Sequence, residues 1–103
     1  MRTIEQRVAV TTAPERVYRY LEDERHLLEL CGLAAEDERV ESLEHVPGRR
    51  LVDRLHGRVD ARLAWELLPH EGVTEVDLTV DGRGLDDRGA EAALRRLKRA
   101  LEA

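Results

Sequence analysis

The side chains able to do chemistry in this chain are few and scattered. The four histidines do not fall at the spacing of a metal-binding pair, and the single cysteine has no second thiol to join it. The chain contains none of the short signatures of hydrolases, phosphate-binding loops, dinucleotide-binding folds or zinc proteases. We therefore predict no metal and no cofactor, assign no catalytic residue, and leave open whether the protein is an enzyme. The histidines are His26, His45, His56 and His70.

Two polar residues on one predicted strand, residues 50–56, are the best candidates for a polar group inside a pocket. Asp53 shares one face of this strand with Leu51 and Leu55, whereas His56 lies on the other face. The alternation does not show which face points inward, so Asp53 and His56 remain alternatives. Whichever side chain faces inward is a candidate general acid or base, and we include both among the ligand-binding residues.

A simpler interpretation of Asp53 places it near water at the rim of the strand. There it would pair with Arg54 or Arg62 in an ordinary surface ion pair and would have no role in binding. We favour this interpretation for Asp53.

The clearest strand pattern, residues 58–67, places Trp65 on an inward apolar face. Trp65 either fills the core, which needs a large side chain because the chain has no Phe, or offers a flat platform to a ligand. We favour core filling. Tyr18 and Tyr20 project in different directions from one helix, so at most one of them faces the interior. The predicted ligand-binding residues are Tyr20, Asp53, His56, Leu63, Trp65, Leu78, Leu94 and Leu97.

Cys31 directly precedes Gly32, which is the predicted residue after the C-terminus of a short helix. The helix dipole disfavours a thiolate at that end. We interpret Cys31 as a small buried apolar residue rather than a nucleophile.

Length and charge restrict the classes of function. A chain of 103 residues corresponds to one domain, and its formal net charge of -5 argues against a general nucleic-acid binder, which would be basic. No apolar run approaches the length of a membrane span and no signal peptide is visible, so we expect a cytoplasmic protein. We interpret the basic cluster on the last predicted helix as a solvated face that complements the helix dipole. It comprises Arg95, Arg96, Lys98 and Arg99.

The first third of the chain predicts a strand followed by two short helices. Residues 3–11 alternate as in a half-buried strand. Thr12 and Glu15 have the spacing of a capping box, with Pro14 in the first helical turn. Asp23 is predicted to close the first helix and to cap the second.

Four strands joined by short turns follow, which predicts an antiparallel meander. The first of them alternates irregularly at Leu43, and a β-bulge or an edge position would explain this. Residues 81–84 are predicted to form a flexible exit to a final amphipathic helix, which Asp86 or Asp87 caps. The predicted strands are residues 38–46, 50–56, 58–67 and 75–81, with a turn at residues 69–72.

The run from Val8 to Leu30 resembles the opening of the START-like superfamily, also called the polyketide cyclase/dehydrase and lipid-transport or SRPBCC superfamily. There the first strand leads into a helix that starts with Ala-Pro and continues with Val, an aromatic residue, Leu and Asp. A Pro-Gly turn, a meander and a last amphipathic helix follow in the same order here. The matching residues are Ala13, Pro14, Val17, Tyr18, Leu21 and Asp23.

The resemblance implies one α+β domain of the helix-grip type over residues 1–103. A curved antiparallel sheet of about five strands, in the order β-α-α-β-β-β-β-α, would pack on the long C-terminal helix. The resemblance also implies that a small hydrophobic ligand binds in a cavity between the sheet and that helix, and in some members cyclase or dehydratase activity.

This chain is shorter than is usual for the superfamily, and its connections are very short. We therefore expect the cavity to be small or filled, and dimerisation through an open sheet edge would compensate for this. The leading hypothesis is a domain that binds a hydrophobic ligand. The alternatives are an enzyme that resembles cyclases or dehydratases, and a small interaction or structural module with a filled core.

Overall fold

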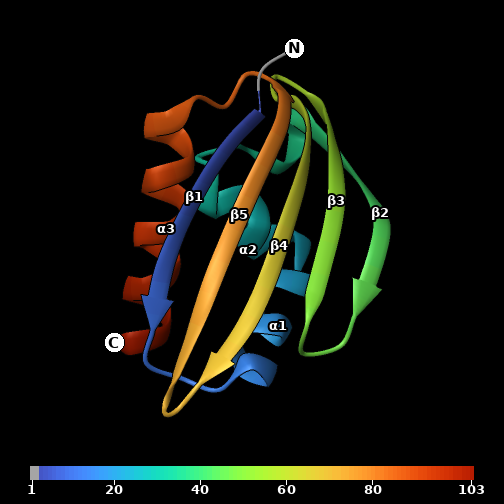
Figure 1. Cartoon of the computed structure of the whole chain (residues 1–103). Helices are drawn as coiled ribbons and strands as arrows, with labels where there is room; N and C mark the ends of the chain where they lie inside the picture. Colours follow the sequence, from blue (N-terminus) through green and yellow to red (C-terminus); the bar gives the residue numbers. More distant parts are fainter. Residues whose placement is uncertain (1–2) are drawn as a thin grey trace.

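The structure is a computed structural model, and it describes residues 3–103 (Figure 1). The strands are β1 (Thr3–Val10), β2 (Glu38–Val46), β3 (Arg50–Gly57), β4 (Asp60–His70) and β5 (Val73–Arg83), and the helices are α1 (Pro14–Glu22), α2 (Glu24–Leu30) and α3 (Asp87–Glu102). A short 3-10 turn, Ala35–Asp37, precedes β2. The strands form one antiparallel sheet in the order β1-β5-β4-β3-β2. This confirms the predicted α+β fold with a five-stranded sheet.

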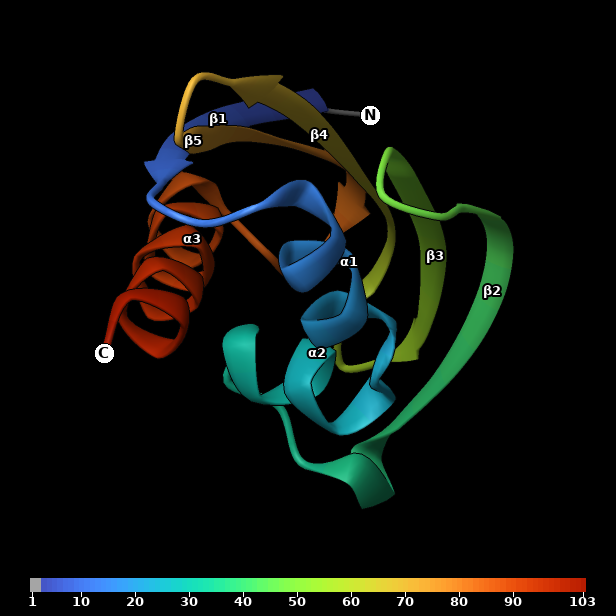
Figure 2. The same ribbon diagram turned by 90° about the horizontal axis from the view of Figure 1, so that it is seen from below.

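The sheet is strongly curved, and all three helices lie on its concave side (Figure 2). α3 packs along β1, while α1 packs against β4 and β3. The backbone N–H of Thr11 donates to Oε2 of Glu102 at 2.8 Å, which fixes the end of α3 to the end of β1. Among the described residues, no helix is long and apolar enough to cross a membrane.

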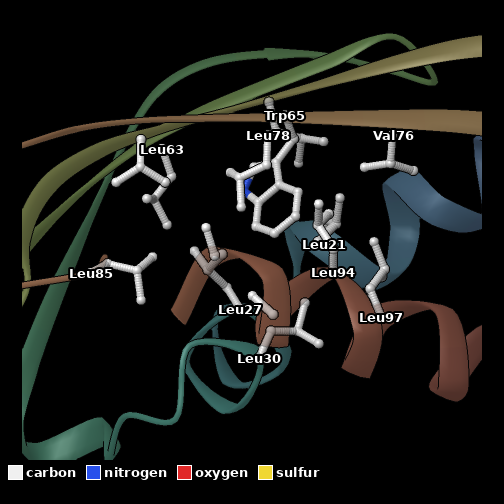
Figure 3. Packing of buried hydrophobic residues seen from close by; sticks show 14 of the residues in the cluster. Leu21, Leu27, Leu30, Leu63, Trp65, Val76, Leu78, Leu85, Leu94 and Leu97 are labelled. Carbon is white, nitrogen blue, oxygen red and sulfur yellow. The ribbon is translucent and has the colours of Figure 1, made fainter. Parts of the chain in front are cut away.

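The core lies between the concave face of the sheet and the apolar faces of the helices. The alternate residues of β4 and β5 that the sequence assigned to the inward face are buried, and Trp65 is fully buried among leucines from all three helices (Figure 3). Burying such apolar side chains supplies the main driving force for the fold. The labelled residues around Trp65 are Leu21, Leu27, Leu30, Leu63, Val76, Leu78, Leu85, Leu94 and Leu97.

The predicted capping box at Thr12 is wrong. α1 has Ala13 at its N-cap without any side-chain cap, and Pro14 starts the helix. Thr12 serves the sheet instead, because its carbonyl accepts a 2.7 Å hydrogen bond from Oγ1 of the buried Thr74. The other two predicted caps are confirmed: Asp23 accepts a hydrogen bond from the N–H of Arg25, and Asp86 caps α3.

The two central strands are longer than predicted. β4 continues through Pro69 to His70, so the predicted turn narrows to the two residues that follow. β5 continues to Arg83, so the predicted flexible exit is wrong. Gly82 explains why the strand persists there: its φ is +145°, and a Cβ on it would lie 2.4 Å from the carbonyl oxygen of Asp60. Only glycine lets the two strands approach this closely.

The basic cluster on α3 is more than a solvated face. Nη1 of Arg96 donates to the carbonyl of Leu30 at 2.7 Å, and Nζ of Lys98 donates to the carbonyl of Ala9 at 2.9 Å. These two bonds connect α3 to the end of α2 and to β1. Arg96 is exposed and Lys98 is half-buried, so the cluster lies on a solvated face as predicted, and these two side chains also bond to the backbone of other elements.

Candidate ligand-binding site on the concave face

Asp53 lies on the concave face of β3, directly opposite Leu63 of β4. Its side chain is only 3% exposed, and its Oδ1 lies 2.8 Å from Nε2 of His45. The favoured interpretation, which placed Asp53 near water beside Arg54 or Arg62, is therefore wrong. The register gives the reason: Arg54 and Arg62 pair with each other in the ladder and have the opposite parity, so they project from the outer face.

A β-bulge at Leu43 directs His45 into this concave face. In the register of β2 and β3, Ser42 lies opposite Asp53 and His45 lies opposite Leu51, with one extra residue of β2 between them. In a regular strand Ser42 and His45 would point to opposite faces. Bulges commonly redirect a side chain next to a functional site. The irregular alternation of this strand had suggested a bulge or an edge position, and β2 has both.

Tyr18 of α1 covers the His45 ring. The two ring centroids are 6.3 Å apart and the rings are nearly perpendicular, at 82°. Burial raises the pKa of the Tyr18 hydroxyl, and the negative charges of Glu22 and Asp53 raise it further. Tyr18 therefore keeps its proton at neutral pH, and its hydroxyl is able to donate a hydrogen bond.

A surface depression lies beside this group of three residues. It has a volume of about 290 Å³ and lies between α1 and the turn that joins β2 to β3. Of the Tyr18–His45–Asp53 group, Tyr18 forms part of its wall, and the other two residues lie behind Tyr18 and are not in the lining. The lining residues are Glu15, Tyr18, Arg19, Glu22, Pro47 and Gly48.

Trp65 provides a further polar atom inside the apolar face. The side chain is fully buried, as the core-filling interpretation predicted, but its Nε1–H has no hydrogen-bond partner among the described residues. Buried tryptophan N–H groups usually find a partner, so this atom is an unused donor. The nitrogen lies on the edge of the ring that faces Leu63 and Leu85 (Figure 3).

A second and larger depression opens at that end of the core. It has a volume of about 620 Å³ and lies where β5 passes into α3. Leu85 contributes both to this depression and to the buried cluster around Trp65. The lining residues are Ile4, Cys31, Gly82, Arg83, Gly84, Leu85, Asp86 and Gly89.

The remaining predicted site residues are distributed between the core and the surface. Leu63, Leu78, Leu94 and Leu97 are buried in the core cluster. Tyr20 is half-buried at the edge of that cluster, and its ring stacks on His26 with the centroids 4.0 Å apart.

His56 and Asp53 point to opposite faces, as their parity predicted. His56 lies on the outer face, where its Nε2 is 2.9 Å from Oε1 of Glu41. The structure thus separates the two candidate polar groups and joins Asp53 to His45 instead.

Sequence reasoning missed His45 and Tyr18 as site residues. The available signal for His45 was the break in alternation at Leu43, because a bulge reverses the direction of every residue that follows it. For Tyr18, the helical spacing allowed only one inward tyrosine, and Tyr18 is the more buried of the two. Among residues 3–103, no three acidic, histidine or cysteine side chains are grouped so that they could hold a metal ion.

No protein-family model matches this chain, and no curated protein matches it. Solved structures do resemble it. The crystal structure of DR_A0006 from Deinococcus radiodurans superposes with a TM-score of 0.77 at 18% identity, over 99% of this chain and 98% of that one. The solution structure of the Aha1 dimer from Colwellia psychrerythraea gives a TM-score of 0.75 at 17% identity, over 99% and 97% of the two chains.

The third comparison is with DynU16, a putative protein in the dynemicin biosynthetic locus. It superposes with a TM-score of 0.76 at 16% identity. The match covers 98% of this chain but only 47% of DynU16. The chain has a helix-grip-like fold. At these identities the comparisons establish the fold, and function has to be argued from the site.

Proposed function

We propose that the concave face of this helix-grip-like protein binds a small, mainly apolar molecule whose polar group meets the Asp53–His45 pair. The observation that carries the proposal is the buried carboxylate of Asp53 on an otherwise apolar face. We further infer that the chain is a short member of the START-like superfamily, on the basis of residues 8–30 and the fold.

A carboxylate in this position is unfavourable for folding alone. Removing an ionised carboxylate from water costs several kcal/mol unless partners replace its hydration. Asp53 has one such partner in His45, whose side chain is itself 24% exposed. A leucine at this position would pack the core without that cost, so the presence of a carboxylate here supports a role in recognition.

Size and surroundings support the same function. The depression beside Tyr18, at about 290 Å³, is near the lower limit of the roughly 300–1,000 Å³ found for small-molecule pockets. A bicyclic aromatic molecule fits this scale better than a long acyl chain. Tyr18 would supply a hydroxyl donor and His45 a ring nitrogen at the polar end of the site.

The test is an NMR titration of ¹⁵N-labelled protein with 2-naphthol. We expect shift changes to concentrate at Tyr18, His45 and Asp53 on the concave face. The outer face provides a matched control, since His56 pairs with Glu41 at 2.9 Å much as His45 pairs with Asp53 at 2.8 Å.

We expect His45→Gln to weaken 2-naphthol binding by about tenfold. The variant removes the imidazole that bonds to the charged Asp53 carboxylate. His56→Gln should leave binding unchanged. Equal losses in the two variants, or shift changes spread over the outer face, would reject this site. Native mass spectrometry of the protein purified without added ligand would detect a bound small molecule as extra mass.

A second candidate function is acid–base catalysis, which the 2.8 Å Asp53–His45 contact favours. A carboxylate that engages Nε2 orients the imidazole and leaves Nδ1 as the proton acceptor. In a cyclase or dehydratase, such a base would take a proton from carbon next to a carbonyl.

With 2-acetylnaphthalene in D₂O, His45 would remove a methyl proton to form the enolate, and a solvent deuteron would then return to carbon. The activity would be established if the methyl proton signal of 2-acetylnaphthalene disappears with the wild type and with His56→Gln but not with His45→Gln. Identical rates of exchange in all three proteins would exclude it.

A homodimer through the β2 edge is a separate hypothesis. β2 is the edge strand farthest from α3 in the sheet order, and the Colwellia psychrerythraea neighbour was solved as a dimer. The bulge at Leu43 and the acidic side chains of β2 oppose continuous pairing with a second copy. Sedimentation equilibrium measures the mass directly, and a monomer at high concentration would remove this hypothesis.

A further inference from the structure

We infer that the bound molecule carries an uncharged hydrogen-bond acceptor, a carbonyl or ether oxygen, which receives the hydrogen bond from Nε1 of Trp65. This inference rests on the proposed ligand-binding function and specifies its chemistry. It assigns to Trp65 a directional role in addition to core packing.

The main observation is the unpaired donor. Trp65 is 0% exposed, and its Nε1 is buried without a partner among residues 3–103. Leaving such a group unpaired destabilises the folded protein, so a ligand atom that accepted this hydrogen bond would stabilise the complex.

The position of Trp65 connects this donor to the Asp53–His45 pair. Trp65 and Leu63 are neighbours on the inward face of β4, and Asp53 lies directly opposite Leu63 on β3. The nitrogen of Trp65 lies on the ring edge that faces Leu63 (Figure 3). Trp65 and Asp53 therefore flank the buried Leu63 on the same inward face, with the donor on one side and the carboxylate on another.

The charges nearby select a neutral acceptor over a carboxylate. Asp53 lies opposite Leu63, and Glu15 and Glu22 line the neighbouring depression against the single basic residue Arg19 of that lining. A ligand carboxylate would be repelled there, whereas a ketone or ether oxygen would not be.

Leu85 connects the larger depression with the buried cluster that contains Trp65. This residue lies in the irregular segment between β5 and α3, lines the 620 Å³ depression, and belongs to the same buried cluster as Trp65. Shortening the Leu85 side chain would therefore extend the depression toward the cluster that contains Trp65.

A single tryptophan makes the test direct, because the ¹⁵N-labelled protein gives one indole N–H signal. We would titrate it with naphthalene, 2-acetylnaphthalene and 2-naphthoate, which share a ring system and differ in the polar group. We expect 2-acetylnaphthalene to bind about tenfold more tightly than naphthalene and to move the indole proton downfield. We expect 2-naphthoate to bind more weakly than 2-acetylnaphthalene.

Two variants complete the experiment. Trp65→Phe keeps an aromatic ring and removes the donor, so the preference for 2-acetylnaphthalene over naphthalene should disappear while naphthalene still binds. Leu85→Ala keeps the indole and should accelerate the binding of naphthalene and of 2-acetylnaphthalene. If Trp65→Phe does not fold, the indole signal and the probe ranking in the wild type and in Leu85→Ala still decide the outcome.

The results separate this inference from the function on which it rests. Equal binding of naphthalene and 2-acetylnaphthalene without an indole shift would overturn the role of Trp65 and leave ligand binding intact. A cross-peak from the indole proton to a long-lived water would also overturn it, because the donor would already be satisfied. Failure of all three probes and of 2-naphthol to bind would overturn both the inference and the proposed function.

Discussion

His45 and Asp53 meet across β2 and β3 at 2.8 Å although they are not opposite each other in the ladder. Asp53 lies opposite Ser42, His45 lies opposite Leu51, and the bulge at Leu43 separates the two pairs. The contact therefore depends on an irregularity of the strand rather than on regular pairing. Bulges often redirect a side chain next to a functional site, and this one brings His45 to the buried Asp53.

Asp53→Leu tests whether this pair serves stability or function. We expect the free energy of unfolding to stay constant or to rise by up to about 2 kcal/mol, because an apolar side chain of similar size replaces a buried carboxylate and the half-buried His45 turns to water. Urea unfolding followed by circular dichroism measures this, with Asp53→Asn as the isosteric control. A loss of more than about 2 kcal/mol in Asp53→Leu would instead make the pair a structural element of the core.

The one-sided alternation of β4 and β5 was enough to predict their inward faces from the sequence, because only one side of this sheet is covered. The helix caps at Asp23 and Asp86 were also predictable, since each depends on residues close in the chain. Thr12 shows the limit: its carbonyl is bound by Thr74, 62 residues away, and no local pattern reports such a contact.

The site was only partly predictable. Parity placed Asp53 and His56 on opposite faces, but β3 has Leu51, Val52 and Asp53 all buried in succession, so its burial does not follow alternation. The inward partner, His45, lies beyond a bulge whose exact effect on register is set by pairing with β3. The register of β2 on β3 beyond the bulge cannot be predicted from local periodicity. The break in alternation at Leu43 did indicate the position of the bulge.

Arg96→Ala tests the connection between α3 and α2. Nη1 of Arg96 donates to the carbonyl of Leu30, the last residue of α2, at 2.7 Å. Removal leaves a helix-terminal carbonyl without this charged donor, so we expect a loss of about 1–2 kcal/mol in the free energy of unfolding. Arg99→Ala, on the exposed side of the same helix, is the matched control and should change stability by less than about 0.5 kcal/mol. Similar losses in both variants would point to helix propensity or net charge instead.

Cys31 should be unreactive in the folded protein. Burial raises the pKa of its thiol to about 12, with Glu38 adding to the effect and Arg96 partly offsetting it. At pH 8 the thiolate fraction is then about 10⁻⁴, against roughly a quarter for an exposed cysteine, so alkylation by iodoacetamide should be about 10³-fold slower than in urea-unfolded protein. Mass spectrometry of timed samples measures both rates. Comparable rates in the folded and unfolded protein would show that the thiol opens to solvent near the 620 Å³ depression.

Asp77 should make stability depend on pH in the direction opposite to most carboxylates. Burial raises its pKa, the neighbouring Glu75 raises it further, and Arg7, whose Nε is 4.0 Å from Oδ1 of Asp77, only partly compensates. Because the folded protein holds this proton more tightly than the unfolded chain, its contribution to stability is complete below the unfolded pKa near 3.8 and is lost as the pH rises through the folded pKa. At neutral pH the charged Asp77 is therefore unfavourable.

Asp77→Asn removes that charge while keeping the shape of the side chain. We expect the variant to be more stable than the wild type at pH 7 by about 0.5–1 kcal/mol, as found for relief of like charges on one sheet face, and to lose this advantage by pH 3. Urea unfolding at pH 3, 5 and 7 gives the three differences. An advantage that persists at pH 3 would assign the effect to hydrogen bonding by the amide, and a less stable variant at pH 7 would show that the ion pair with Arg7 outweighs burial and Glu75.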